Sequence, residues 1–93
     1  MNVAERRTSY EICWEILTFC SVPRTFTAIV GRCDLNSKNG QKYLGLLAGR
    51  GFLNVEDDGE RSHYVATDRA EEFITQFTLL YKGLYDKGPG FRL

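Results

Sequence analysis

The chain has 93 residues with 12 basic and 12 acidic side chains, so its formal net charge is zero. This length suits one domain, and 43% hydrophobic residues with six Phe, five Tyr and one Trp indicate a folded chain rather than a disordered one. No apolar run is long enough to span a membrane. The polar residues 1–7 are unlike a signal peptide, so we expect a cytoplasmic protein. Zero net charge also argues against a protein that binds polyanions.

The three cysteines, Cys13, Cys20 and Cys33, make an odd number without a Cys-x-x-Cys pair. A disulfide framework needs an even number of cysteines, and a zinc site needs closely spaced pairs of ligands. We therefore expect three reduced core residues and no metal site.

A first helix is predicted to begin at Thr8 or Ser9 and to end before Pro23. Thr8 and Glu11 have the spacing of a capping box, and proline disfavours helical geometry at the residue before it. Glu11 and Glu15 are expected on the solvent side of this helix. Its apolar face consists of Ile12, Cys13, Ile16, Leu17 and Cys20.

A short second helix is predicted from an N-cap at Thr25 to Cys33, and a third from Asn36 or Ser37 to Ala48. Only a tight turn joins the two helices. Gly residues end the third helix at a left-handed position. The expected buried stripe of the third helix is Tyr43, Leu44, Leu47 and Ala48.

After the third helix the hydrophobic period changes from about 3.6 residues to 2, which predicts strands at residues 52–56 and 62–66. In the first strand Leu53 and Val55 alternate with polar residues and are expected on the same face. An Asp-Gly pair within residues 57–61 is typical of a hairpin turn.

A last helix is predicted over residues 67–86, capped by Thr67 or Asp68, with residues 87–93 as a tail. Its apolar stripe is wider than one small core covers, and such patches usually mark an interface. The candidate dimerisation residues are Phe73, Phe77, Leu80, Tyr81 and Leu84.

The predicted order is helix, helix, helix, strand, strand, helix, which is a mainly α fold with a small β-hairpin. Three helices and a hairpin form a winged helix-turn-helix, in which a short turn joins the second and third helices. We expect one domain over residues 1–93, with a core at residues 8–66 and the last helix available for dimerisation.

The charges are segregated along the chain. Residues 24–50 contain five basic residues and one aspartate, whereas residues 54–72 contain seven acidic residues and two arginines. The basic segment coincides with the predicted helix-turn-helix, and the acidic segment with the hairpin and the start of the last helix. The neutral total therefore does not exclude a nucleic-acid partner, because DNA binding requires cations at one face only.

Polar side chains at the exposed start of the third helix are the candidate DNA contacts. Asn and Gln bond the adenine edge, and Lys reaches guanine or phosphate. Gly40 would allow a close approach to the groove. The alternative is that these are ordinary solvated residues of a surface helix. The candidates on this helix are Ser37, Lys38, Asn39, Gln41 and Lys42.

Four further residues are candidate phosphate contacts. Thr25 offers a hydroxyl and a backbone N–H at the start of the second helix, and equally serves as a plain N-cap. Arg24 and Arg50 lie near the two ends of the helix-turn-helix, and Arg61 lies in the hairpin turn beside acidic residues that repel phosphate. His63 is expected on an exposed strand face without a second metal ligand.

Several short motifs occur in an order that resembles a known family. Arg24-Thr25, Ile29-Val30 and Leu35-Asn36 are followed by Lys42-Tyr43-Leu44, Gly51-Phe52-Leu53 and Tyr64-Val65-Ala66-Thr67. The pattern over residues 8–85 is similar to the archaeal winged helix-turn-helix family that includes small dimeric chromatin-type DNA-binding proteins. The resemblance implies binding to double-stranded DNA and dimerisation through the helix after the wing. Asp68-Arg69-Ala70 departs from the Lys-Gly step frequent in the family.

The sequence thus favours a homodimeric double-stranded DNA-binding protein, either a transcription regulator or a chromatin-associated factor, with its third helix in the major groove. The alternative is a protein-interaction module that docks through the acidic wing or the apolar last helix. No catalytic motif, cofactor motif or small-molecule site is evident.

Overall fold

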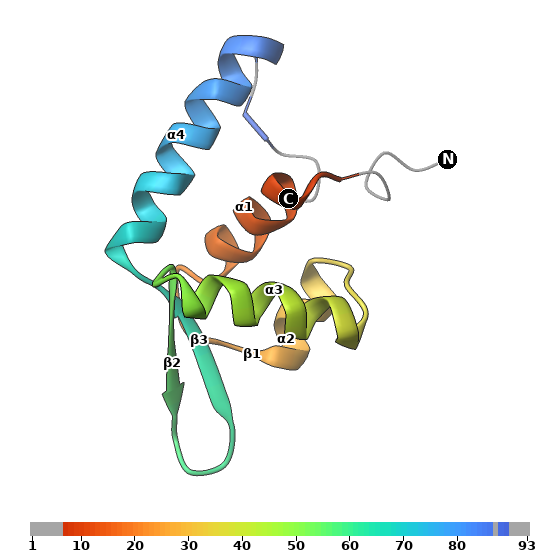
Figure 1. The fold of residues 1–93 in the computed structure, drawn as a ribbon, viewed down its shortest axis with the longest axis vertical. Coiled ribbons are helices and arrows are strands. Elements are labelled where there is room, and N and C mark those ends of the chain that lie inside the picture. The colour runs from red at the N-terminus through yellow and green to blue at the C-terminus, as the bar shows by residue number, and fades with distance from the viewer. Residues whose placement is uncertain (1–6, 87, 90–93) are drawn as a thin grey trace.

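A computed structural model describes residues 7–86 and 88–89 (Figure 1). The winged helix-turn-helix order is confirmed, with one additional short strand before the second helix. The hairpin of β2 and β3 projects from one end of the molecule and α4 from the other, while α1 lies between α4 and α3 (Figure 1). The elements are α1 Ser9–Phe19, β1 Arg24–Thr25, α2 Phe26–Arg32, α3 Ser37–Gly49, β2 Leu53–Asp57, β3 Ser62–Ala66 and α4 Asp68–Tyr85.

The extra strand β1 makes a three-stranded antiparallel sheet of order β1-β3-β2. Arg24 pairs with Tyr64 and Thr25 with His63. A strand of two residues is too short for the hydrophobic period to reveal. Because Thr25 also caps α2, accepting a hydrogen bond from Ala28 N at 3.2 Å, β1 fixes the start of α2 against the wing.

The predicted helix caps are confirmed at α1 and α3. Thr8 Oγ1 accepts from Glu11 N at 3.2 Å, and Thr8 N donates to Glu11 Oε1 at 2.8 Å, which completes the capping box. Asn36 Oδ1 accepts from Asn39 N at 2.7 Å. Thr67 occupies the N-cap of α4, but its hydroxyl donates to Gly51 O at 2.6 Å and so ties α4 to the end of α3.

The hydrophobic core surrounds α1, whose Ile16 and Leu17 are fully buried. Trp14 Nε1 donates to Thr78 Oγ1 of α4 at 3.2 Å. In β2 only the first residue, Leu53, is buried, whereas Val55 on the same face is 52% exposed because the hairpin projects from the body of the domain. The buried apolar residues are Cys13, Trp14, Ile16, Leu17, Cys20, Ile29, Cys33, Tyr43, Leu44, Leu47, Leu53 and Ala70.

Gly40 is buried where α2 and α3 cross, and not on the exposed face of α3. A Cβ at this position would overlap Val30 Cγ1 and lie 3.2 Å from Phe26 Cζ. The prediction that Gly40 allows a close approach to a DNA groove is therefore wrong, because this residue does not face solvent. Its missing side chain lets the two helices of the helix-turn-helix pack together.

Glu15 is not on the solvent side of α1, as its spacing from Glu11 suggested, but is 3% exposed. Its carboxylate forms an ion pair with Arg7, whose guanidinium also donates to Cys33 O at 2.6 Å. A buried charge is tolerated because it is paired and hydrogen-bonded. The pair joins the segment before α1 to the turn between α2 and α3.

We expect Gly40→Ala to lower the free energy of unfolding by about 1–3 kcal/mol, because the added methyl group overpacks the α2–α3 crossing. Gly45→Ala is the control, since a Cβ there meets no atom within 4 Å. In an exposed helix interior this change should stabilise the protein by about 0.5–1 kcal/mol. Urea denaturation measures both values, and equal effects of the two substitutions would contradict the packing argument.

Candidate nucleic-acid interface

The exposed face of α3 carries two lysines followed by two glycines. Lys38, Lys42, Gly45 and Gly49 are all exposed, and steps of four, three and four residues place them on one line along the helix. This line lies opposite the buried stripe that begins at Gly40. The face therefore presents positive charge at its N-terminal half and bare backbone at its C-terminal half.

The other predicted α3 residues flank this line. Ser37 and Asn39 are exposed at the start of the helix. Gln41 lies on the side of the wing, where it lines a hollow of about 440 Å³ together with Val55 and Tyr64. The structure thus brings the five third-helix candidates together around the N-terminal half of α3. The sequence did not indicate the apolar hollow beside Gln41, because it forms between α3 and the hairpin.

Arg24 is half-buried and has an internal partner. Its Nε donates to Phe19 O at 2.9 Å, and its guanidinium carbon lies 4.1 Å from the centre of the Phe19 ring. Arg32 lies over the same ring at 5.7 Å. The sequence did not predict this contact, which leaves Arg24 with fewer donors for a phosphate than an exposed arginine has. The hydroxyl of Thr25 accepts a hydrogen bond from Ala28 N, as an N-cap does.

Arg50 is exposed at the end of α3, and Arg61 is exposed in the turn of the wing. The turn is anionic and internally bonded. Asp58 Oδ1 accepts from Arg61 N at 3.0 Å and Glu60 N at 2.9 Å, and these backbone donors lower the pKa of Asp58. His63 is half-buried, with Nδ1 3.8 Å from the Asp58 carboxylate. The wing tip therefore stays negatively charged at neutral pH.

A row of aromatic rings follows α4 away from the body of the domain. The ring centres of Phe52 and Phe73 are 6.0 Å apart, those of Phe73 and Phe77 6.0 Å, those of Phe77 and Tyr81 5.9 Å, and those of Tyr81 and Tyr85 4.7 Å. The row begins against the core and ends in solvent, since Tyr85 is 59% exposed. Tyr85 is not among the residues predicted for dimerisation, although it follows Tyr81 by four positions, which places the two on one face of the helix.

Two leucines beside this aromatic row are exposed, Leu80 by 62% and Leu84 by 68%. Together with Phe77, Tyr81 and Tyr85 they line one side of a hollow of about 230 Å³ against the start of α1. Phe73, also predicted for dimerisation, is half-buried and packs against the core.

A family model described as winged helix-turn-helix matches residues 6–82. The chain belongs to the winged helix-turn-helix family. A comparison with curated proteins gives no match.

Solved structures share this winged helix-turn-helix fold. The chain is similar to Sso10a-2, a DNA-binding protein from Sulfolobus solfataricus, with 28% identity and a TM-score of 0.75 over 86% of this chain and 87% of that one. It is also similar to the homodimeric winged helix-turn-helix DNA-binding domain of Mb0332 from Mycobacterium bovis, a possible ArsR-family transcriptional regulator. The identity is 20% and the TM-score 0.65, and the match covers 77% of this chain and 69% of that one. The Sulfolobus protein confirms the archaeal resemblance seen in the sequence.

A third structure is MarR from Staphylococcus aureus in complex with salicylate and kanamycin, with 22% identity and a TM-score of 0.70. The match covers 80% of this chain and 53% of that one. At this identity the likeness concerns the fold alone. The winged helix of this protein is thus shared with DNA-binding proteins and with similarly folded regulators.

The three cysteines of the winged-helix core, Cys13, Cys20 and Cys33, are buried, as predicted. Burial raises the pKa of Cys13 to about 11. Burial and the nearby Cys33 raise the pKa of Cys20 to about 12, although Arg24 opposes part of the rise. Across the described residues, 7–86 and 88–89, no group of three or more His, Cys, Asp or Glu is placed to hold a metal ion, and no helix is long and apolar enough to cross a membrane.

We expect the cysteines to resist alkylation by iodoacetamide in the folded protein at pH 8, because the reactive species is the thiolate and burial disfavours it. Mass spectrometry after timed labelling measures this protection. In urea all three should react within minutes, which provides the control. Rapid labelling of the folded chain at Cys13 or Cys20 would show that these thiols are more accessible than the structure indicates.

Proposed function

We propose that this winged helix-turn-helix protein binds double-stranded DNA as a transcription regulator or chromatin-associated factor, with α3 in the major groove. The observation that carries the proposal is the exposed face of α3, where Lys38 and Lys42 stand one turn apart. An α-helix fits the major groove, and the recognition helix of a helix-turn-helix enters it by its N-terminal residues. The Sulfolobus relative, described as a DNA-binding protein, supports the same role.

The polar residues around Lys38 divide by the contacts that their chemistry allows. Asn39 and Gln41 suit base edges, whereas the lysines and Ser37 suit phosphates or guanine. Gly45, on the same line as the lysines, adds no side chain that would hold the helix away from a groove.

Phosphate contacts are proposed at both ends of the helix-turn-helix. Arg50 is exposed at the end of α3, and Thr25 is the N-cap of α2. Arg24 keeps its bond to Phe19 O, so it contributes through the rest of its guanidinium. Arg61 lies beside carboxylates that repel phosphate, so the wing contributes little to affinity. We expect weak, salt-sensitive binding that depends on more than one copy of the chain.

The second copy is proposed to pack along α4. Leu80, Leu84 and Tyr85 form an exposed apolar face at the outer end of the aromatic row. Burying such a face is favourable, and a two-fold dimer would double the basic face that meets the DNA. The Mycobacterium domain with the same fold is described as homodimeric.

Replacing both lysines, Lys38→Ala with Lys42→Ala, should weaken duplex binding by roughly tenfold at low salt and reduce the salt slope by about two per chain. Lys82→Ala is the matched control, because this lysine lies on α4 away from the α3 face. Fluorescence anisotropy with a labelled duplex across a salt series measures both quantities.

The protein-interaction alternative rests on the exposed acidic wing. If the unaltered chain shows no duplex binding at low salt, the DNA proposal fails and this alternative is favoured. An equal loss of affinity in the Lys82→Ala control would instead indicate diffuse electrostatic attraction without a specific role for α3.

The double substitution Leu80→Glu with Leu84→Glu should make the protein monomeric at micromolar concentration, because it places charges in the proposed apolar interface. Leu79→Glu is the control, since Leu79 is 65% exposed on the opposite side of α4. Sedimentation equilibrium measures the association. A monomeric unaltered chain, or equal disruption by Leu79→Glu, would refute dimerisation through this face.

A further inference from the structure

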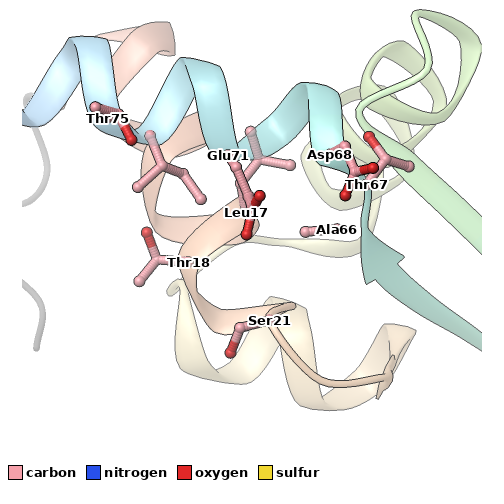
Figure 2. Close-up of a pocket in the computed structure, with 9 residues that line it drawn as sticks. Leu17, Thr18, Ser21, Ala66, Thr67, Asp68, Glu71 and Thr75 are labelled. Atoms are coloured by element: carbon pink, nitrogen blue, oxygen red, sulfur yellow. The ribbon is translucent and has the colours of Figure 1, made fainter.

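A cavity of about 610 Å³ lies between the C-terminal end of α1, the end of β3 and the first two turns of α4 (Figure 2). It is separate from the exposed face of α3 and from the apolar end of α4. Its volume falls within the range of small-molecule sites, about 300–1,000 Å³. The cavity is lined by Leu17, Thr18, Ser21, Ala66, Thr67, Asp68, Glu71, Ile74 and Thr75.

The lining combines an apolar surface with negative charge. Leu17, Ala66 and Ile74 supply the apolar part, and Asp68 and Glu71 supply two carboxylates from the first turn of α4. Among the described residues no basic side chain lines the cavity, and neither carboxylate forms an ion pair with any of them. The site is therefore electrostatically suited to a cation and unsuited to an anion.

The cavity wall also contains an unsatisfied polar group. Thr18 Oγ1 is buried and has no hydrogen-bond partner among the described residues. A buried hydroxyl without a partner costs free energy. The hydroxyls of Ser21 and Thr75 add further polar groups at the rim (Figure 2).

We propose that this cavity binds a small organic cation with an apolar body, such as a primary amine on an alkyl or aryl chain. The ammonium group lies against Asp68 and Glu71, and the apolar body covers Leu17 and Ile74. Both carboxylates also interact favourably with the positive N-terminal end of the α4 dipole. That role does not account for the adjoining apolar cavity or for the buried hydroxyl of Thr18.

The location gives binding a structural consequence. β3 is joined to α1 beside the cavity by the bond from Ala66 N to Cys20 O, 2.8 Å long. A ligand that contacts both α1 and α4 fixes the orientation of α4 relative to the rest of the domain.

The test is a titration of the full chain, followed by amide NMR, with 4-phenylbutylamine and with 4-phenylbutyrate as a probe of the same shape and opposite charge. We expect saturable shifts at Leu17, Ala66 and Glu71 with the amine alone. Glu71→Gln should lower the affinity for the amine by about fivefold, as expected for the loss of one partly exposed charge. Glu72→Gln, which removes the same charge from the adjacent residue outside the cavity, should leave the affinity unchanged.

A second pair of variants tests the site by filling it. Thr75→Lys places an ammonium group of the chain itself at the cavity and should abolish the amine shifts, whereas Gln76→Lys, one position along and outside the cavity, should not. The proposal is overturned by an absence of saturable amine shifts, by equal binding of the butyrate, or by equal effects within either pair of variants. The experiment contains no DNA, so its outcome is independent of the proposed DNA-binding function.

Discussion

The position of the candidate DNA-binding face depends on the absence of one side chain, at Gly40. Helices α2 and α3 pack so closely at this point that a methyl group would overlap Val30 and press on the ring of Phe26. Close packing there lets Tyr43 and Leu47 reach the core around α1. With these two residues buried, the helical repeat leaves Lys38 and Lys42 facing solvent. The buried glycine thus permits the α2–α3 crossing on which the position of this face depends.

A buried ion pair then holds the helix-turn-helix to the rest of the domain. Arg7 reaches Glu15 on α1 and the backbone carbonyls of Cys33 and Asp34, in the turn between α2 and α3. Removing either charge would leave the other without its partner in a medium that solvates it poorly, which is strongly destabilising. The electrostatics of this protein are therefore divided between an internal pair that fixes the fold and surface charges that are segregated into a basic helix and an acidic wing.

Much of the architecture was predictable because it follows from local rules. The capping box at Thr8, the N-cap at Asn36 and the change of hydrophobic period at Leu53 each depend on residues within a few positions of one another. The division of charge along the chain and the apolar stripe of α4 are likewise visible in the linear sequence. From these features the order of elements, the burial of the cysteines and the exposed lysines of α3 could be inferred.

By itself, then, the sequence determined the helices, the hairpin, the core stripe and the segregation of charge, since near neighbours set them. Only the tertiary structure decided which residues meet across the fold. It pairs Glu15 with Arg7, places Arg24 over Phe19, and leaves Val55 exposed beyond the body of the domain. It also places the carboxylate of Glu71 beside a cavity that three elements form together. Such contacts depend on the relative placement of helices and strands, which no spacing along the chain records.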